Sequence, residues 1–161
     1  MKKLVALLLV AVMMVSVAAC GNGGSSEEVK EPETVGEFLL QDFKSNPEGS
    51  AQEIADRVIQ NEILPFDAVT MPVEPGFLTG FDNAEITGFN EGVMFAPMMG
   101  TIPFVGYVFA LEDGADVDGF VQTLEESANL RWNICTEAEE MVAEAEGNTV
   151  FFLMCPKNFE E

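Results

Sequence analysis

Residues 92–111 read GVMFAPMMGTIPFVGYVFAL, twenty consecutive positions without a charged side chain. A run of this length meets the size requirement of a transmembrane helix. Its interior, however, holds Pro97, Gly100, Pro103 and Gly106. A lipid-facing helix tolerates such breaks only where neighbouring spans satisfy the freed backbone groups, and the chain offers no second span for this purpose. We therefore expect two core strands, near residues 92–97 and 103–111, joined through residues 98–102.

Apolar spacing on both sides of this run predicts the elements that pack around it. Residues 35–43 are apolar on one side and predict a first helix, and Ser50 and Glu53 form a capping box for a helix over residues 51–63. Downstream we expect a helix that follows residues 113–118 and ends near residue 130, then strands at 141–145 and 149–155 around a turn at 146–148. The order is helix, strand, strand, helix, strand, strand. It predicts a single α+β domain over residues 34–161, with an antiparallel sheet of about four strands and helices packed on one face.

The first 33 residues predict export and attachment to a membrane. Two lysines precede an uncharged run over residues 4–19, the pattern of a secretory signal peptide. The run ends in VAAC and a glycine, which resembles the bacterial lipobox, whose cysteine is acylated and becomes the new N-terminus. We expect a signal peptide at 1–19, a lipid on Cys20 and a flexible tether over 20–33, with the domain on the extracytoplasmic face of the cell membrane. An ordinary signal peptide, with Cys20 incidental, is the alternative.

The charge of the chain limits its partners. It has 28 acidic and seven basic residues; removing residues 1–19 takes away two lysines and leaves a net charge of −23. Such a charge repels phosphate backbones, so we expect no nucleic-acid partner. It also repels anionic lipid headgroups, so we expect the domain to stand off such a surface.

Two cysteines remain beyond Cys20, at positions 135 and 155. Outside the cytoplasm, two cysteines in a small domain are often bridged, and a Cys135–Cys155 disulfide is one interpretation. Two thiols buried in the core are the other. Spacing along the chain does not decide between them.

Few residues in this sequence indicate chemistry. Histidine is absent, which removes Ser-His-Asp and Cys-His catalysis and the common zinc sites, so we expect a non-enzyme without a cofactor. Asp116, Asp118 and Glu125 fit three positions of a calcium loop. The apolar face that begins at Val117 instead indicates a helix that has already started, with the acids capping it.

Arg131 and Trp132 form the remaining candidate, because the only tryptophan stands next to one of the few cations. They are a candidate recognition site. The alternative is that Trp132 covers the edge of the core and that Arg131 complements a helix C-terminus.

Several short motifs resemble a domain family of Gram-positive lipoproteins. They are GFLTGFD at 76–82, ITGF at 86–89, the late arginine at 131 and the hairpin at 146–151. The likeness covers roughly residues 51–155. The family is a domain of unknown function, so the resemblance implies a lipoprotein and an α+β fold and assigns no activity.

Anchor, tether and acidity together predict a non-enzymatic interaction or binding domain with a partner in the cell envelope. A solute-binding lipoprotein that serves a transporter is the alternative. Solute-binding lipoproteins usually have two lobes around a cleft, and a chain of this length is small for such an architecture.

Overall fold

A computed structural model describes residues 31–99 and 101–159 of the chain. The expected signal peptide, the acylation site at Cys20 and the tether up to residue 30 lie outside these residues and stay predictions. The described residues belong to one unit, Glu31–Glu161.

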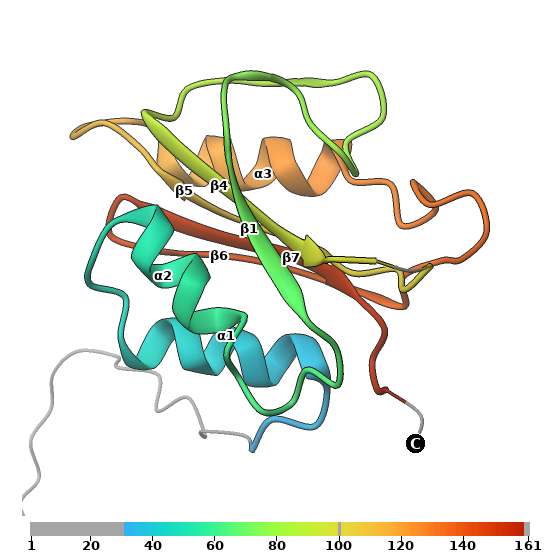
Figure 1. Ribbon diagram of the computed structural model, residues 1–161. Coiled ribbons are helices and arrows are strands. Elements are labelled where there is room, and N and C mark those ends of the chain that lie inside the picture. Colours follow the sequence, from blue (N-terminus) through green and yellow to red (C-terminus); the bar gives the residue numbers. More distant parts are fainter. Residues whose placement is uncertain (1–30, 100, 160–161) are drawn as a thin grey trace, which may run out of the picture. The chain divides into compact units, whose positions relative to one another are not determined.

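The uncharged run forms the two strands expected of it. β4 (Glu91–Pro97) and β5 (Val105–Ala110) pair antiparallel, with Val93 opposite Val108. They lie inside a five-stranded antiparallel sheet of order β1-β4-β5-β7-β6 (Figure 1). In the part of the chain that the structure describes, no helix is long and apolar enough to cross a bilayer.

The sheet is apolar on both faces, which explains why the run carries no charge. Tyr107 and Phe109 of β5 face one side, and Val108 faces the other; all three are fully buried. β7 (Thr149–Cys155) alternates in the same way beside it, with Phe151 and Phe152 in different core clusters. A strand covered on both faces has no position where a charged side chain reaches water.

Two helices cover one face of the sheet. α1 (Val35–Ser45) packs on β6 and β7, and α2 (Ala51–Val58) packs on β1, β4 and β5. The capping box at Ser50 and Glu53 is formed as predicted. α2 ends earlier than expected, because the Asn61 side chain accepts a hydrogen bond from the backbone N–H of Ile63 at 3.1 Å and supports a turn instead.

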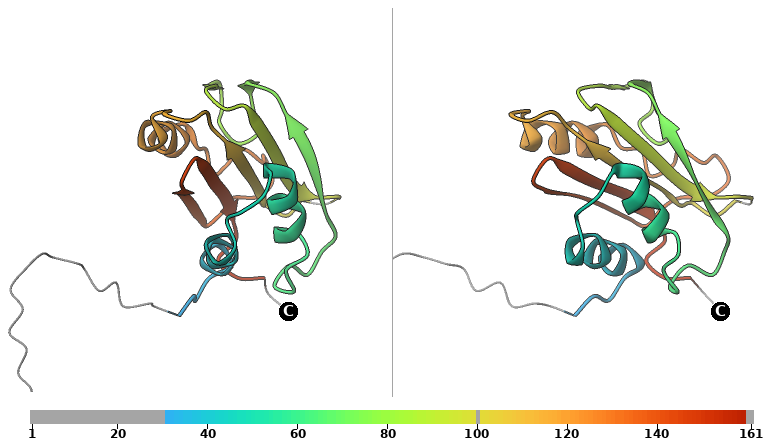
Figure 2. Two further views of the ribbon diagram at one scale, coloured as in Figure 1. Left: turned by 90° about the vertical axis from the view of Figure 1, so that its left-hand side faces the viewer. Right: turned by 60° about the vertical axis from the view of Figure 1, so that its left-hand side comes forward.

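The third helix, α3 (Val117–Ser127), lies on the opposite face of the sheet, as Figure 2 shows. There it packs with the segment between β1 and β4, which contains the short strands β2 (Gly76–Phe77) and β3 (Glu85–Ile86). The α+β class and the antiparallel sheet are confirmed. The placement of the helices differs from the expectation of one covered face, because β5 and β7 present large apolar side chains to both sides.

The two edge strands complete the sheet. β1 (Ala68–Val73) is a fifth strand beyond the four expected. Pro72 breaks the strand pattern in the sequence, yet proline is compatible with an edge strand, where one side of the backbone has no partner strand. β6 (Glu140–Glu146) forms the other edge and extends the expected strand at 141–145 by one residue at each end.

Candidate functional site

A surface hollow of about 300 Å³ lies between two loops on the α3 side of the sheet. We call it the Trp132 hollow. It is lined by Leu78, Thr79, Gly80, Asp82, Asn129, Arg131 and Trp132. The structure thus brings the two candidate recognition residues and the neighbouring Asn129 amide together with a carboxylate, Asp82, from a distant position in the sequence.

The loop at 78–82 is fixed from beneath by the sheet. The buried Tyr107 hydroxyl donates a hydrogen bond to the backbone oxygen of Thr79 at 2.8 Å, and burial raises the pKa of Tyr107 above its usual range. Gly80 has φ +97°, and a Cβ there would lie 2.5 Å from Cε of Met154. Asp82 is the one non-glycine residue of the described chain with positive φ, at +50°. A non-glycine residue with positive φ is strained, and this conformation persists only where the surrounding structure holds it.

Asn129 joins this loop to the segment that carries Arg131 and Trp132. Its backbone N–H donates to the Gly80 oxygen at 2.8 Å, and its side-chain amide donates to Asp82 Oδ1 at 2.5 Å. Its side-chain oxygen accepts from the backbone N–H of Arg131 at 2.8 Å. The carboxylate, the guanidinium and the indole are therefore carried by one hydrogen-bonded pair of loops.

The side chains of Arg131 and Trp132 differ in exposure. Trp132 is half-buried and packs against the core beneath α3, as the alternative interpretation expected. Arg131 lies beyond the end of α3, so it does not complement that helix terminus. Its side chain is 74 % exposed, and its Nε lies 3.5 Å from Oε2 of the exposed Glu137. Solvent screens such a pair, so the guanidinium is free to exchange Glu137 for another acceptor.

A second surface feature lies where the loops β4–β5 and α3–β6 meet. Met98, Met99 and Ile134 are 60 %, 83 % and 96 % exposed, and we call these three residues the apolar tip. The two loops are joined at the Thr101 backbone oxygen, which accepts from Thr136 Oγ1 at 2.6 Å. The apolar tip is thus built from two separate loops held side by side.

The two cysteines are free thiols in the structure, so the disulfide that the sequence left open is not formed. Cys135 is exposed next to Ile134. Cys155 is fully buried at the end of β7, and its thiol donates to Glu140 Oε1 at 3.4 Å. Burial, with the nearby Glu140 carboxylate, raises the pKa of Cys155 far above its usual range. The buried-thiol interpretation describes Cys155 and not Cys135.

The three acids of the calcium-loop pattern lie on a helix. Asp116 is the N-cap of α3 and accepts from the backbone N–H of Gly119 at 3.0 Å, while Asp118 lies in the first turn and Glu125 is exposed. The helix starts at Val117, as its apolar face indicated, so the coordinating loop is not formed. Among residues 31–99 and 101–159, no group of three or more Asp, Glu, Cys or His is placed to hold a metal ion.

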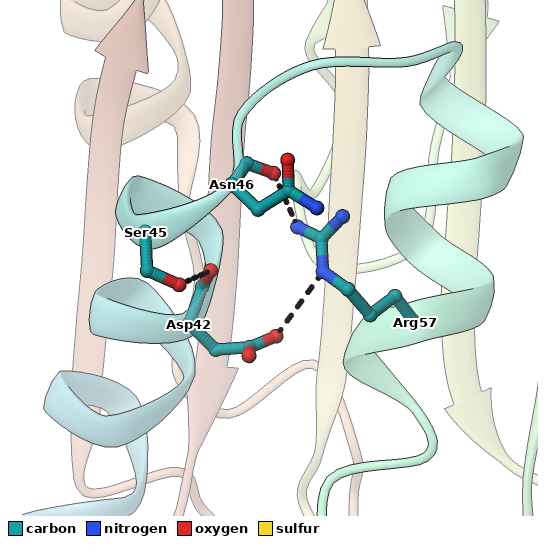
Figure 3. Close-up of polar contacts among 4 residues, drawn as sticks. All are labelled: Asp42, Ser45, Asn46 and Arg57. Carbon is teal, nitrogen blue, oxygen red and sulfur yellow. Dashed lines mark hydrogen bonds and ion pairs between the residues drawn. The ribbon is translucent and has the colours of Figure 1, made fainter.

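An ion pair that the sequence did not indicate joins α1 to α2 (Figure 3). Arg57 Nε lies 3.7 Å from Asp42 Oδ2, and the guanidinium also donates to the backbone oxygen of Asn46 at 2.7 Å. The Nε and Oδ2 atoms are buried and make no hydrogen bond of their own. This pair lies between two packed helices and away from the Trp132 hollow, so its role is to hold α2 against α1.

Comparison with protein-family models, with curated proteins and with solved structures finds no match to this chain. The resemblance to a Gram-positive lipoprotein domain therefore stays a prediction.

Proposed function

We propose that this chain is an extracytoplasmic lipoprotein, anchored through Cys20, whose domain binds a cell-envelope partner and catalyses no reaction. The lipobox-like VAAC and the glycine- and serine-rich segment after it support the anchor. The Trp132 hollow carries the proposal of binding, because it gathers the only indole of the chain, an exposed guanidinium and a carboxylate on a braced surface.

The chemistry of these groups is that of recognition. A guanidinium forms paired, charge-assisted hydrogen bonds with carboxylates. Asp82 accepts from N–H donors, and the half-buried indole offers an apolar face beside these polar groups. A ligand that carries both a carboxylate and an N–H group, such as a polar segment of a protein chain, fits this set.

The size of the hollow favours a protein partner over an engulfed solute. Its volume of about 300 Å³ is at the lower end for pockets that enclose a small molecule. A partner side chain that enters the hollow, with further contacts on the surrounding surface, needs no deeper cavity. A solute-binding lipoprotein is the second candidate, and the same hollow would serve it.

Site-specific photo-cross-linking on intact cells tests the proposal. A photoreactive residue replaces Thr79 on the exposed rim of the hollow, or Gln122 on the exposed side of α3 as the control position. We expect a discrete protein adduct from position 79 and none from position 122. Arg131→Gln removes the adduct, whereas Lys157→Gln, which removes an equal charge elsewhere on the surface, does not.

The emission of Trp132 distinguishes the second candidate. Because Trp132 is the only tryptophan, its fluorescence reports on the hollow alone. A saturable change during titration with a panel of dipeptides, without any protein adduct from position 79, would favour solute binding. Absence of both signals would contradict a binding role for the hollow.

A further inference from the structure

The apolar tip lies at the end of the sheet where the domain begins. β4 ends at Pro97 and β5 starts at Val105, which is opposite Met154 near the end of β7. The first helix starts at this same end, because the backbone N–H of Val35 donates to the Lys157 oxygen at 2.9 Å, and that of Gly36 donates to Glu140 Oε1 at 2.7 Å. β4 and β7 are the two neighbours of β5 in the sheet, so the last residue of β4 and the last residue of β7 lie roughly 10 Å apart.

The proposed tether between Cys20 and α1 is short. About a dozen residues separate the expected lipid on Cys20 from the domain, and a chain of this composition has a root-mean-square reach of roughly 20 Å. An anchored domain is therefore held with its α1 start close to the bilayer. Met98, Met99 and Ile134 are at that end, within reach of the lipid surface.

The two segments that carry the apolar tip have no charged side chain. Residues 92–111 and 132–136 contain no acidic or basic side chain, in a chain whose mature form carries −23. Acidic side chains elsewhere keep the body of the domain away from anionic headgroups. Transfer of the three exposed apolar side chains from water into the lipid, in contrast, lowers the free energy. Weak insertion is sufficient, because the anchor makes the second contact intramolecular.

We propose that the apolar tip inserts into the lipid surface beside the anchor and sets the orientation of the domain on the membrane. The proposal rests on the lipid anchor of the proposed function. In this orientation the opposite end of the sheet, where Phe77 lies, points away from the bilayer. β1 starts at the tip end, with Ala68 opposite Pro97, and reaches the far end at Val73, opposite Gly92; β2, which contains Phe77, follows it.

Native Cys135 provides the probe. It is exposed beside Ile134, whereas Cys155 is buried and the acylated Cys20 has no free thiol. The full acylated protein is labelled with a thiol-reactive NBD fluorophore and reconstituted into phosphatidylcholine vesicles that contain spin-labelled lipid. The matched control is Cys135→Ser with Phe77→Cys, which places the same label at a position that is 68 % exposed at the far end of the sheet.

We expect the label at position 135 to lose most of its emission to the spin-labelled lipid and the label at position 77 to keep it. Replacing Met98, Met99 and Ile134 by serine removes the quenching while the protein still floats with the vesicles; Phe77→Ser leaves it unchanged. Vesicles rich in phosphatidylglycerol give weaker quenching, because the acidic domain is repelled by the anionic headgroups. Added salt screens this repulsion and brings the quenching back to its level in phosphatidylcholine vesicles.

Two results would overturn the inference in different ways. Flotation with equal quenching at positions 135 and 77 would leave the anchor standing and show that the tip does not touch lipid, in which case it is available to a protein. Failure to float with Cys20 intact would overturn the anchor and, with it, the insertion of the tip.

Discussion

Gly106→Ala is a sharp test of the β4–β5 pairing, because Gly106 of β5 lies opposite Phe95 of β4. A Cβ on Gly106 would lie 2.1 Å from Cζ and 2.3 Å from Cε2 of the Phe95 ring, where carbon atoms normally pack at about 3.5–4.0 Å. Phe95 is fully buried, with the rings of Phe104 and Phe151 centred 6.0 and 5.9 Å away. The ring therefore has little room to move aside.

The magnitude follows from two opposing effects. Overpacking of this kind costs about 1–3 kcal/mol, and replacing glycine by alanine in a strand returns about 0.5–1 kcal/mol of backbone entropy. The difference between these ranges is a fall of about 0–2.5 kcal/mol in the free energy of unfolding, and a contact of 2.1 Å with a fully buried ring places the expected fall in the upper half, at about 1–2.5 kcal/mol. Urea unfolding of the chain without residues 1–20, followed by the emission of Trp132, measures it.

A double-mutant cycle separates the clash from other effects. Phe95→Leu removes the ring that the new methyl group would meet, so the double variant should lose less stability than the two single changes together, by about 1 kcal/mol. A neutral or stabilising Gly106→Ala, or strict additivity with Phe95→Leu, would refute the register in which these two residues face each other.

Three further predictions concern side chains that the structure places. Arg57→Met leaves the partly buried Asp42 carboxylate without its cation and should cost about 1–3 kcal/mol in urea unfolding, whereas a loss below about 0.5 kcal/mol would show that water replaces the pair. Asp116→Ala should cost about 1 kcal/mol as a lost helix cap, and millimolar calcium should leave the melting temperature of the wild type unchanged; a calcium-dependent rise would favour the ligand interpretation instead. Because burial raises the pKa of Cys155, its thiol stays protonated, so a thiol reagent at pH 8 should modify only Cys135 until the domain is unfolded, and rapid labelling of two thiols in the native state would contradict the buried position.

The sequence was most informative where one physical constraint dominates. A twenty-residue run without charge, broken by prolines and glycines, predicts buried strands, and β4 and β5 formed there. The capping box at Ser50 and Glu53 likewise depends on neighbours only and was predicted correctly. β1 was missed because Pro72 reads as a strand breaker until the strand is known to lie at an edge.

The surface features depend on distant pairs and could be predicted only in part. Arg131 and Trp132 stood out by composition, but Asp82 is 47 residues from Asn129, and nothing local indicates that the two side chains meet. The closely spaced Gly80 and Asp82 were a signal for an unusual loop, although not for its neighbour. Ile134 gave no signal at all, because its exposure follows from how two loops pack.

We propose that a lipid on Cys20 holds this domain outside the cell, and the intact mass of the protein extracted from membranes shows whether that lipid is present. The proposal predicts a chain that starts at Cys20 and carries the mass of a diacylglycerol group, with or without a further acyl chain, and a Cys20→Ala variant without this added mass. A wild-type chain that keeps residues 1–19, or that is cleaved without any added lipid, would contradict it.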